Sequence, residues 1–391
     1  MDVFGLFAGI GGLEYGLNTY PQNHVVGMCE ILPEAQCVIA SHHPGVPIHD
    51  DITTLHTLNG ADVVTAGFPC QDISIAGPKV GLNGNRSSLV THIFRLIRET
   101  PNAQRPDFVV IENVANLISL HSGEVLKYIT DQFNELGYEW AYRLVDPRSL
   151  GIPQRRPRFV CVASRVVHPV NLLFPHDEDY EAIIEDKLHG DTQDPYGFYW
   201  TEGKIGIGWA NNSIPPLKCG SSLGLPSAPA IWNPVADFFG TPSIHDAEHL
   251  QGFDDDWTAP LIEHGYKNSL RWKLLGNAVN THVSSWIADR IMNPNGLAFN
   301  EANVIGRQHK KWSKAGFSRN GLSYAISSSA YPEGINYEPI MHYLREPLTP
   351  LSLKATLGFR RRVVESTLIT YPNGFVESLN NYLHNQYQYA D

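Results

Sequence analysis

The chain has 391 residues, enough for one large domain and a smaller one, and its 42% hydrophobic content is ordinary for a folded globular protein. No stretch approaches the roughly 20 apolar residues that a membrane span requires, and the first residues do not resemble a signal peptide. We therefore expect a cytoplasmic protein that binds no membrane. The five cysteines form no Cys-x-x-Cys pair, so the sequence indicates neither a disulfide framework nor a metal site.

The formal net charge of -11 argues against a nucleic-acid partner when it is taken alone. The charge is unevenly distributed, however, because residues 301–391 carry ten Lys and Arg against seven Asp and Glu. Basic residues also cluster at Arg155-Arg156, from Arg307 to Arg319 and from Arg360 to Arg362. Since contacts to phosphate depend on local patches, the net charge does not exclude DNA.

The first 164 residues alternate short apolar strands with helical patterns, which indicates a mostly parallel sheet wrapped by helices. We assign them to a catalytic domain of the α/β class. The predicted strands are 2–7, 24–30, 62–66, 107–112, 139–145 and 158–163, and the predicted helices are 13–20, 33–42, 87–99 and 123–136.

The pattern changes after this region. Residues 165–240 are irregular and rich in Pro, Gly and Asn, and they predict a smaller, separate domain. Residues 241–293 contain helical patterns at 245–250 and 277–292, which we interpret as an anchor for that domain and a helix returning to the catalytic domain. Residues 294–391 form a C-terminal extension to which the sequence assigns no role.

A glycine turn, Phe7-Ala8-Gly9-Ile10-Gly11-Gly12, lies between the first strand and the first helix. Glycines there allow backbone N–H groups to approach a cofactor. Glu30 ends the second strand about 20 residues after these glycines, the spacing at which an acid reaches ribose hydroxyls. Asp51 is a candidate acceptor for an adenine amine, although a helix N-cap is the simpler interpretation of it alone.

Reactive side chains follow the ends of later strands. Cys70 comes just after the strand at 62–66, where an open α/β sheet exposes its ligand crevice. Glu112 and Asn113 end the strand at 107–112, and the segment from Gln154 to Arg158 brings three arginines to the start of the last strand. Arginine forks suit phosphate and base carbonyl oxygens, so these groups predict a common site.

These motifs, together with Gly276-Asn277-Ala278-Val279, occur in one order in the C5 cytosine DNA methyltransferases, which the chain resembles over residues 2–164 and 241–290. The resemblance implies a Rossmann-like S-adenosylmethionine-dependent methyltransferase fold with a mixed, mostly parallel sheet. It also implies that residues 165–240 form an irregular target-recognition domain.

The same resemblance implies the chemistry. A cytosine flips out of double-stranded DNA, Cys70 adds to its C6, and C5 takes a methyl group from S-adenosyl-L-methionine. Glu112 is then expected to be protonated and to donate at N3, because addition of the thiolate places negative charge there. Arg156 and Arg158 hold the base and stabilise the thiolate.

By the same carry-over, Phe7 faces the adenine, Glu30 binds the ribose and Asp51 binds the adenine amine. The full set expected to bind the methyl donor is Phe7, Ala8, Gly9, Gly11, Gly12, Glu30, Ile31, Asp51, Ile52, Pro69, Leu89, Asn277 and Val279. The set expected to contact DNA is Gln71, Ser74, Arg86, Asn113, Gln154 and Arg155. No metal is implied. We expect a monomer, either an orphan or phage-type enzyme or one that shares its site with a restriction endonuclease.

Two departures from the family pattern stand out: Arg86-Ser87 replaces an Arg-Gly pair, and Pro242 replaces an arginine. Two alternatives remain open. A tRNA cytosine-5 methyltransferase of the same family would carry a Cys-Phe-Thr motif, which this chain lacks. A non-catalytic DNA-binding regulator with this fold would tend to lose Cys70, Glu112 or Arg158, and all three are present.

Overall fold

The computed structural model describes residues 1–69, 89–174, 193–202, 206–220, 229–294, 299–308, 311–366 and 371–388. The chain forms two compact units, and each is assembled from three separate segments. Unit 1 comprises Met1–Asp146, Pro157–Glu181 and Val279–Gly334, and unit 2 comprises Pro147–Arg156, Ala182–Ala278 and Ile335–Asp391. No helix within the described ranges has the length and apolar character needed to cross a bilayer.

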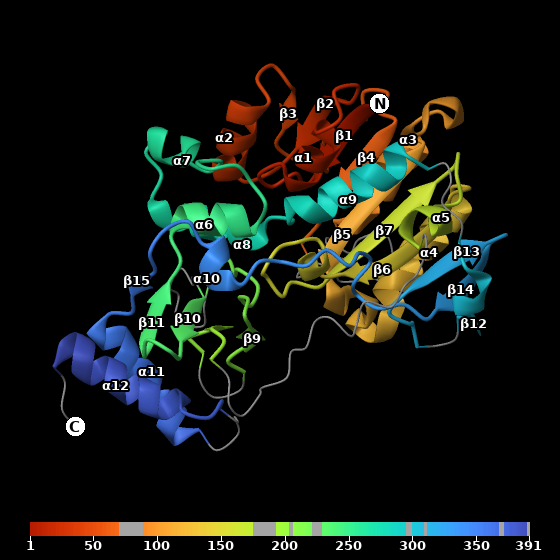
Figure 1. The fold of residues 1–391 in the computed structure, drawn as a ribbon. Coiled ribbons are helices and arrows are strands. Elements are labelled where there is room, and N and C mark those ends of the chain that lie inside the picture. The colour runs from red at the N-terminus through yellow and green to blue at the C-terminus, as the bar shows by residue number, and fades with distance from the viewer. Residues whose placement is uncertain are drawn as a thin grey trace. The chain divides into compact units, whose positions relative to one another are not determined.

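Unit 1 is built on a ten-stranded sheet with the order β12-β14-β13-β6-β7-β5-β4-β1-β2-β3 (Figure 1). Five of the strands, from β3 to β5, are parallel, and β7 is inserted antiparallel between β5 and β6. Parallel strands covered on both faces are buried along their whole length, as in β4, where every residue is buried and only Thr65 is polar. The strands are β1 (Asp2–Leu6), β2 (His24–Cys29), β3 (Ile48–His49), β4 (Val63–Ala66), β5 (Phe108–Val114), β6 (Glu139–Val145) and β7 (Arg158–Ser164).

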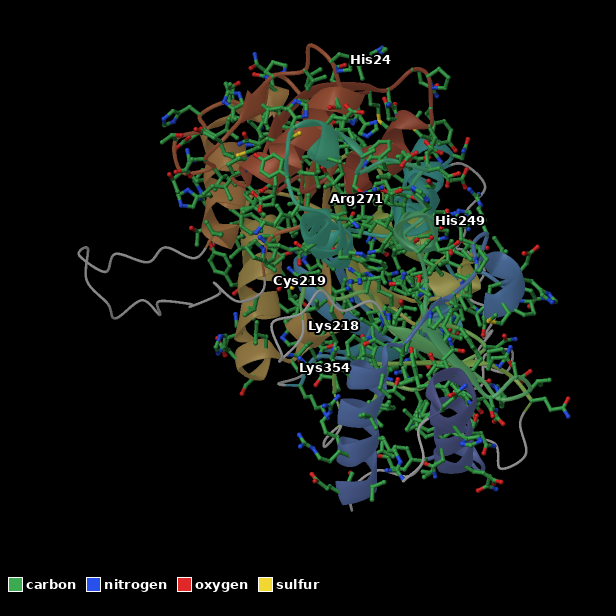
Figure 2. The ribbon with its side chains drawn as sticks, turned by 90° about the vertical axis from the view of Figure 1, so that its left-hand side faces the viewer. His24, Lys218, Cys219, His249, Arg271 and Lys354 are labelled. Atoms are coloured by element: carbon green, nitrogen blue, oxygen red, sulfur yellow. The ribbon has the colours of Figure 1, made fainter. Side chains whose placement is uncertain are left out.

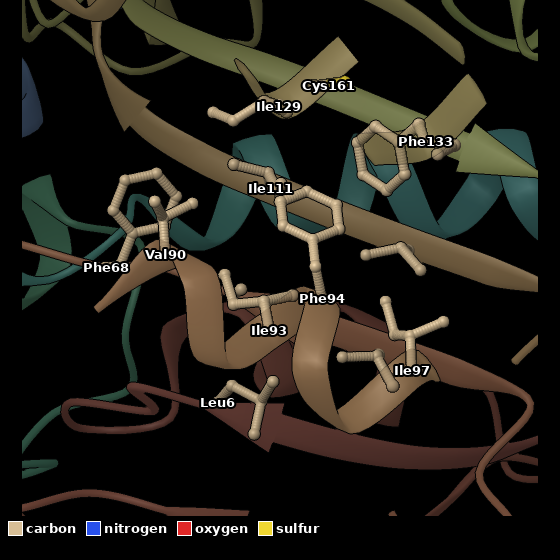
Figure 3. Packing of buried hydrophobic residues seen from close by; sticks show 14 of the residues in the cluster. Leu6, Phe68, Val90, Ile93, Phe94, Ile97, Ile111, Ile129, Phe133 and Cys161 are labelled. Atoms are coloured by element: carbon tan, nitrogen blue, oxygen red, sulfur yellow. The ribbon is translucent and has the colours of Figure 1, made fainter. Parts of the chain in front are cut away.

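The helices of unit 1 pack their apolar stripes on this sheet. Helix α3 places Ile93 and Phe94, four and three residues before Ile97, in the same cluster as Ile97, Leu6 of β1 and Ile111 of β5 (Figure 3). This spacing gives the helix a continuous apolar face, which fixes it on the sheet. The helices are α1 (Gly12–Asn18), α2 (Pro33–His42), α3 (Val90–Glu99), α4 (Glu124–Glu135), α5 (Pro169–Leu173) and α9 (Thr281–Met292).

Residues after 294 are not a separate extension, which corrects the predicted boundary. Strands β12 (Val304–Arg307), β13 (Gly316–Arg319) and β14 (Leu322–Ile326) continue the sheet of unit 1, with β13 pairing antiparallel to β6 (Figure 1). These strands join the sheet because they carry apolar side chains that become buried there, such as Phe317 and Ala325. Their pairing with β6 covers a sheet edge that would otherwise expose unpaired backbone groups.

Unit 2 contains a five-stranded sheet with the order β15-β11-β10-β8-β9. Its core is largely aromatic: Trp232, Phe239 and Tyr382 lie in one cluster with Phe375, whose ring is 5.0 Å from that of Trp232. The elements are β8 (Tyr196–Phe198), β9 (Ala210–Asn211), β10 (Ala230–Asn233), β11 (Phe238–Thr241), α6 (Ile244–Leu250), α7 (Pro260–Glu263), α8 (Asn268–Asn277), α10 (Ile340–Tyr343), β15 (Thr349–Pro350), α11 (Leu353–Glu365) and α12 (Phe375–Tyr387).

The domain boundaries predicted at 164, 240 and 293 therefore differ from the compact units. Residues 335–391 complete the core of unit 2, because β15 pairs with β11 and helix α12 contacts β11. One helix boundary also differs. The pattern at 277–292 is interrupted, because Asn277 ends α8 and Asn280 caps α9 by accepting a hydrogen bond from the backbone N–H of His282.

Candidate functional site

The turn after β1 is a run of left-handed backbone conformations. The φ angles of Phe7, Gly9 and Gly11 are 55°, 58° and 83°. Glycine adopts this region without strain, whereas Phe7 does so at a cost that the surrounding structure must offset. A Cβ placed on Gly9 would meet nothing within 4 Å, so this side of the loop is open. A loop of this kind presents backbone N–H groups to a ligand.

Glu30 closes this loop against the end of β2. One carboxylate oxygen accepts a hydrogen bond from the Gly9 N–H at 2.7 Å, and the other accepts one from the Leu32 N–H at 2.8 Å. Burial raises the pKa of Glu30, while these backbone donors act in the opposite direction. The acid predicted from its spacing thus lies beside the glycine loop. Its carboxylate retains lone pairs that can accept from hydroxyl groups.

Helix α9 fixes the other side of the loop. The Ser284 hydroxyl donates to the carbonyl oxygen of Gly12 at 2.7 Å. A Cβ on Gly16 would lie 2.2 Å from the carbonyl carbon of Ser284, so α1 and α9 approach with their backbones in direct contact. Ser284 was not predicted from the sequence, since a serine inside a helical pattern gives no signal until the crossing of the two helices is known.

The remaining residues expected to bind the methyl donor lie in different environments. Asp51 accepts a hydrogen bond from the Thr53 backbone N–H at 2.8 Å, which is the turn-capping alternative raised above, and this bond lowers the pKa of its carboxyl. Ile52 is buried in the core, whereas Ile31 is 67% exposed beside Glu30. Leu89 is half-buried against the same core as Ile52, and Pro69 is exposed.

Glu112 and Arg158 form an ion pair where β5 ends and β7 begins. The Nε atom of Arg158 lies 3.1 Å from the Oε1 atom of Glu112, and both side chains are largely buried. The antiparallel register explains the meeting, because Val114 pairs with Arg158 and Glu112 pairs with Val160 across the two strands. The structure thus brings together two of the residues that were predicted to act on a base.

Asn113 connects this pair to the segment that precedes Cys70. Its buried side-chain amide donates to the carbonyl oxygen of Phe68 at 2.9 Å, and its Oδ1 accepts from the Val114 N–H at 2.9 Å. The chain is therefore tied to β5 two residues before Cys70. The predicted residues Cys70, Gln71, Ser74 and Arg86 lie outside the described residues.

Gln154 and Arg156 belong to unit 2 and are buried there. Arg156, 1% exposed, donates to three backbone carbonyl oxygens, those of Leu217, Gly276 and Ala278, at 2.8 to 2.9 Å. Gln154 donates to the carbonyl oxygen of Leu250 at 2.8 Å. The structure thus places both side chains in the interior of unit 2, which disfavours their predicted contacts with a base and with DNA. Those contacts remain predictions.

The same polar cluster holds the end of α8. Gln251 donates to the carbonyl oxygens of Leu275 and Ala278. A Cβ on Gly276 would lie 2.3 Å from the Cys219 nitrogen, so α8 packs directly on the backbone of Lys218 and Cys219, both of which are labelled in Figure 2. Asn277 is exposed at the end of α8, Val279 is nearly buried in unit 1, and Arg155 is half-exposed with its N–H bonded to the Ile214 carbonyl.

The parallel sheet with its inserted antiparallel strand, the left-handed glycine loop after β1 and the acid ending β2 define the class. Unit 1 has the Rossmann-like fold of S-adenosylmethionine-dependent methyltransferases. Among solved structures the chain is similar to the Dnmt2 methyltransferase of S. pombe, with a TM-score of 0.50 and 19% identity, covering 75% of this chain and 99% of that one. This likeness concerns the fold.

The sequence comparisons identify the family. The model of the C-5 cytosine-specific DNA methylases matches residues 1–196. The chain is 41% identical to the Type II methyltransferase M2.BsuMI of Bacillus subtilis over 97% of each chain. It is 28% identical to the Type II methyltransferase M.HaeII of Haemophilus aegyptius over 75% of this chain and 93% of that one. The chain belongs to the C-5 cytosine-specific DNA methylase family and is a DNA cytosine methyltransferase.

Proposed function

We propose that this enzyme flips a cytosine out of double-stranded DNA, attacks its C6 with Cys70 and methylates its C5, after which C5 loses its proton to water or a basic side chain and the Cys70–C6 bond breaks. The observation that supports this best is the tie between the end of β5 and the chain before Cys70. Asn113 holds the Phe68 carbonyl, and Glu112, the preceding residue, is paired with Arg158. An acid held beside the segment that leads to the nucleophile can act on the same ring as the nucleophile.

Glu112 and Arg158 have different roles at the base. When the Cys70 thiolate adds to C6, negative charge develops at N3 of the ring, and a proton from Glu112 neutralises it. Arg158 has a planar fork of donors that suits the base carbonyl, and its contact with the Glu112 carboxyl fixes its direction. Arg156 acts indirectly, because its guanidinium hydrogen-bonds to backbone carbonyls of unit 2.

The loop from Phe7 to Gly12 and Glu30 fit S-adenosyl-L-methionine, which would supply the methyl group. The open side of Gly9 and the left-handed turn admit a ligand close to the backbone, and the Glu30 carboxylate can accept from ribose hydroxyls. Phe7, whose ring meets that of Phe68 at 6.4 Å, offers an aromatic face for an adenine.

The biological setting follows from the relatives. Both relatives described above are Type II methyltransferases, which supports a role in restriction-modification with an endonuclease that cuts the same site. We expect the enzyme to work as a monomer in the cytoplasm. Genomic DNA from cells expressing it should resist that endonuclease, and light scattering during size-exclusion chromatography should give the mass of a single chain.

One assay tests the activity. Transfer of labelled methyl from S-adenosyl-L-methionine is measured on duplex DNA and on tRNA, with the wild-type chain and with Cys70→Ala. We expect transfer to DNA alone and none by Cys70→Ala. Glu112→Gln should lower kcat by roughly 10²-fold or more, since it removes a proton donor. Transfer to tRNA alone, or full activity of Cys70→Ala, would overturn the proposal.

A further inference from the structure

Glu14 is a buried carboxyl group to which neither the motifs nor the proposed chemistry assign a role. It lies in the first turn of α1, directly after the glycine loop, and is 1% exposed. The Thr65 hydroxyl of β4 hydrogen-bonds to its Oε1 atom. Its Oε2 atom has no hydrogen-bond partner among the described residues.

The backbone is shaped around this carboxyl. A Cβ placed on Gly5 of β1 would lie 2.4 Å from Oε1 and 2.8 Å from the carboxyl carbon of Glu14. Only glycine therefore fits at this position while Glu14 points inward. The carboxyl thus fills the space between Gly5 of β1 and Thr65 of β4. Gly5 lies two residues before Phe7, where the loop begins.

The surroundings favour the neutral acid. The pKa of Glu14 is raised to about 7: burial raises it most and the charge of Glu30 adds to this, while the bond to Thr65 acts in the opposite direction. Other titratable groups on the elements that contact α1 are Asp2 of β1, His24 and Cys29 of β2, and His282, Asp289 and Arg290 of α9. Asp289 bonds to Tyr20, and Arg290 pairs with Glu333. Glu30 is the charged group that acts on Glu14.

We propose that Glu14 is a positioning residue that holds the methyl-donor loop in its binding conformation only while its carboxyl is protonated. In that form its O–H donates to the Thr65 oxygen, and the Thr65 hydroxyl, 3.5 Å from the Phe4 carbonyl oxygen, can donate there. The chain of bonds ties α1 to β4 and β1 beneath the loop. This role rests on the proposal that the loop binds S-adenosyl-L-methionine.

Ionisation reverses the effect. A carboxylate at this position would be buried away from water and would repel Glu30. Since Glu30 holds the Gly9 N–H, that repulsion acts directly on the loop. Affinity for the methyl donor should therefore fall as the pH rises through the range in which Glu14 loses its proton.

Titration calorimetry tests this with the full chain and S-adenosyl-L-methionine at pH 6.5, 7.5 and 8.5. For the wild type we expect the Kd to rise roughly tenfold across this range, a typical size for coupling between two sites. Glu14→Gln, which stays neutral and can still bond to Thr65, should keep the low-pH affinity at every pH. Glu124→Gln is the matched control, because Glu124 also lies in the first turn of a helix but is exposed. It should behave as the wild type does.

The outcomes separate the two proposals. If the wild type does not bind S-adenosyl-L-methionine at pH 6.5, the loop is not the donor site, and both proposals fail. If the wild type binds with a Kd that does not change with pH, or if Glu14→Gln keeps the wild-type slope, the role of Glu14 alone is overturned. Because a folding defect would not flatten the pH profile, Glu14→Gln distinguishes positioning from general support of the fold.

Discussion

At the scale of single residues, neighbouring arginines of one motif have different surroundings. Arg156 is buried among carbonyl oxygens of unit 2, whereas Arg158 pairs with Glu112 in unit 1. The resemblance to the family implied that both would act on the target base. Which guanidinium reaches a carboxylate and which reaches the backbone depends on where β7 begins, and the motif does not contain that information.

The two arginines should respond differently to lysine. Arg156→Lys cannot reach all three carbonyls, and leaving buried acceptors without donors costs about 1–3 kcal/mol each. We expect a clear loss of stability of unit 2 in urea denaturation. Arg158→Lys keeps its charge beside Glu112 and should change stability little, while lowering kcat. An equal loss of stability in both variants would contradict this assignment.

The buried Glu14 should also make folding depend on pH. Below pH 4.5 the carboxyl is protonated in both the folded and the unfolded chain. As the pH rises from 4.5 to about 7 the unfolded chain releases this proton while the folded chain keeps it, so the free energy of unfolding falls. The contribution is about 3 kcal/mol. Denaturation of Glu14→Gln across this range should lack that decrease relative to the wild type, and parallel curves would refute the burial effect.

At the scale of elements, the close crossing of α1 and α9 determines how the donor loop is supported. The two helices meet at Gly16 and Ser284 without intervening side chains, and the Ser284 hydroxyl bonds to the carbonyl of Gly12. The sequence predicted both helices, but it gave no sign that they touch, since they are separated by more than 260 residues of chain. Their contact explains why α9, the last helix of the region that resembles the family, packs against α1, the first helix.

A pair of glycine substitutions tests this crossing. Gly16→Ala adds a Cβ that would overlap the backbone of α9, and overpacking of this kind typically costs about 1–3 kcal/mol. Gly358→Ala in α11 is the matched control, because the nearest atom to its Cβ would be 3.6 Å away. Alanine there should stabilise the helix by up to about 1 kcal/mol. Thermal unfolding that shifts both variants in the same direction would argue against the close contact.

At the scale of the whole molecule, each unit is assembled from separate segments of the chain, and the C-terminal residues belong to unit 2. Residues 335–391 supply Phe359, Phe375 and Tyr382 to the aromatic core of unit 2. Two of their basic side chains make contacts within unit 2: Arg345 pairs with Asp255, and Arg362 donates to the Trp200 carbonyl. These residues, predicted as part of a C-terminal extension, are therefore an integral part of the fold.

Truncation distinguishes these views. A chain ending at Gly334 should leave Trp232 and Phe239 without their aromatic partners, and we expect it to be insoluble or to lose unit 2 in limited proteolysis. A chain ending at Gln388, after α12, should fold as the full chain does. A soluble, protease-resistant protein ending at Gly334 would show that the C-terminal part is dispensable.

The sequence by itself determined most of the elements in the first 164 residues, with the short strand β3 not predicted, and also the glycine loop, Glu30 and the candidate site residues Glu112 and Arg158. These features depend on local chemistry, namely apolar periodicity, glycine at turns and polar residues at strand ends. Only the tertiary structure decided the burial of Arg156 and Gln154, the contact of α1 with α9, the environment of Glu14 and the division of residues 294–391 between two units. Each of these depends on segments distant in the chain packing together, and the pattern of a single segment does not specify its partner.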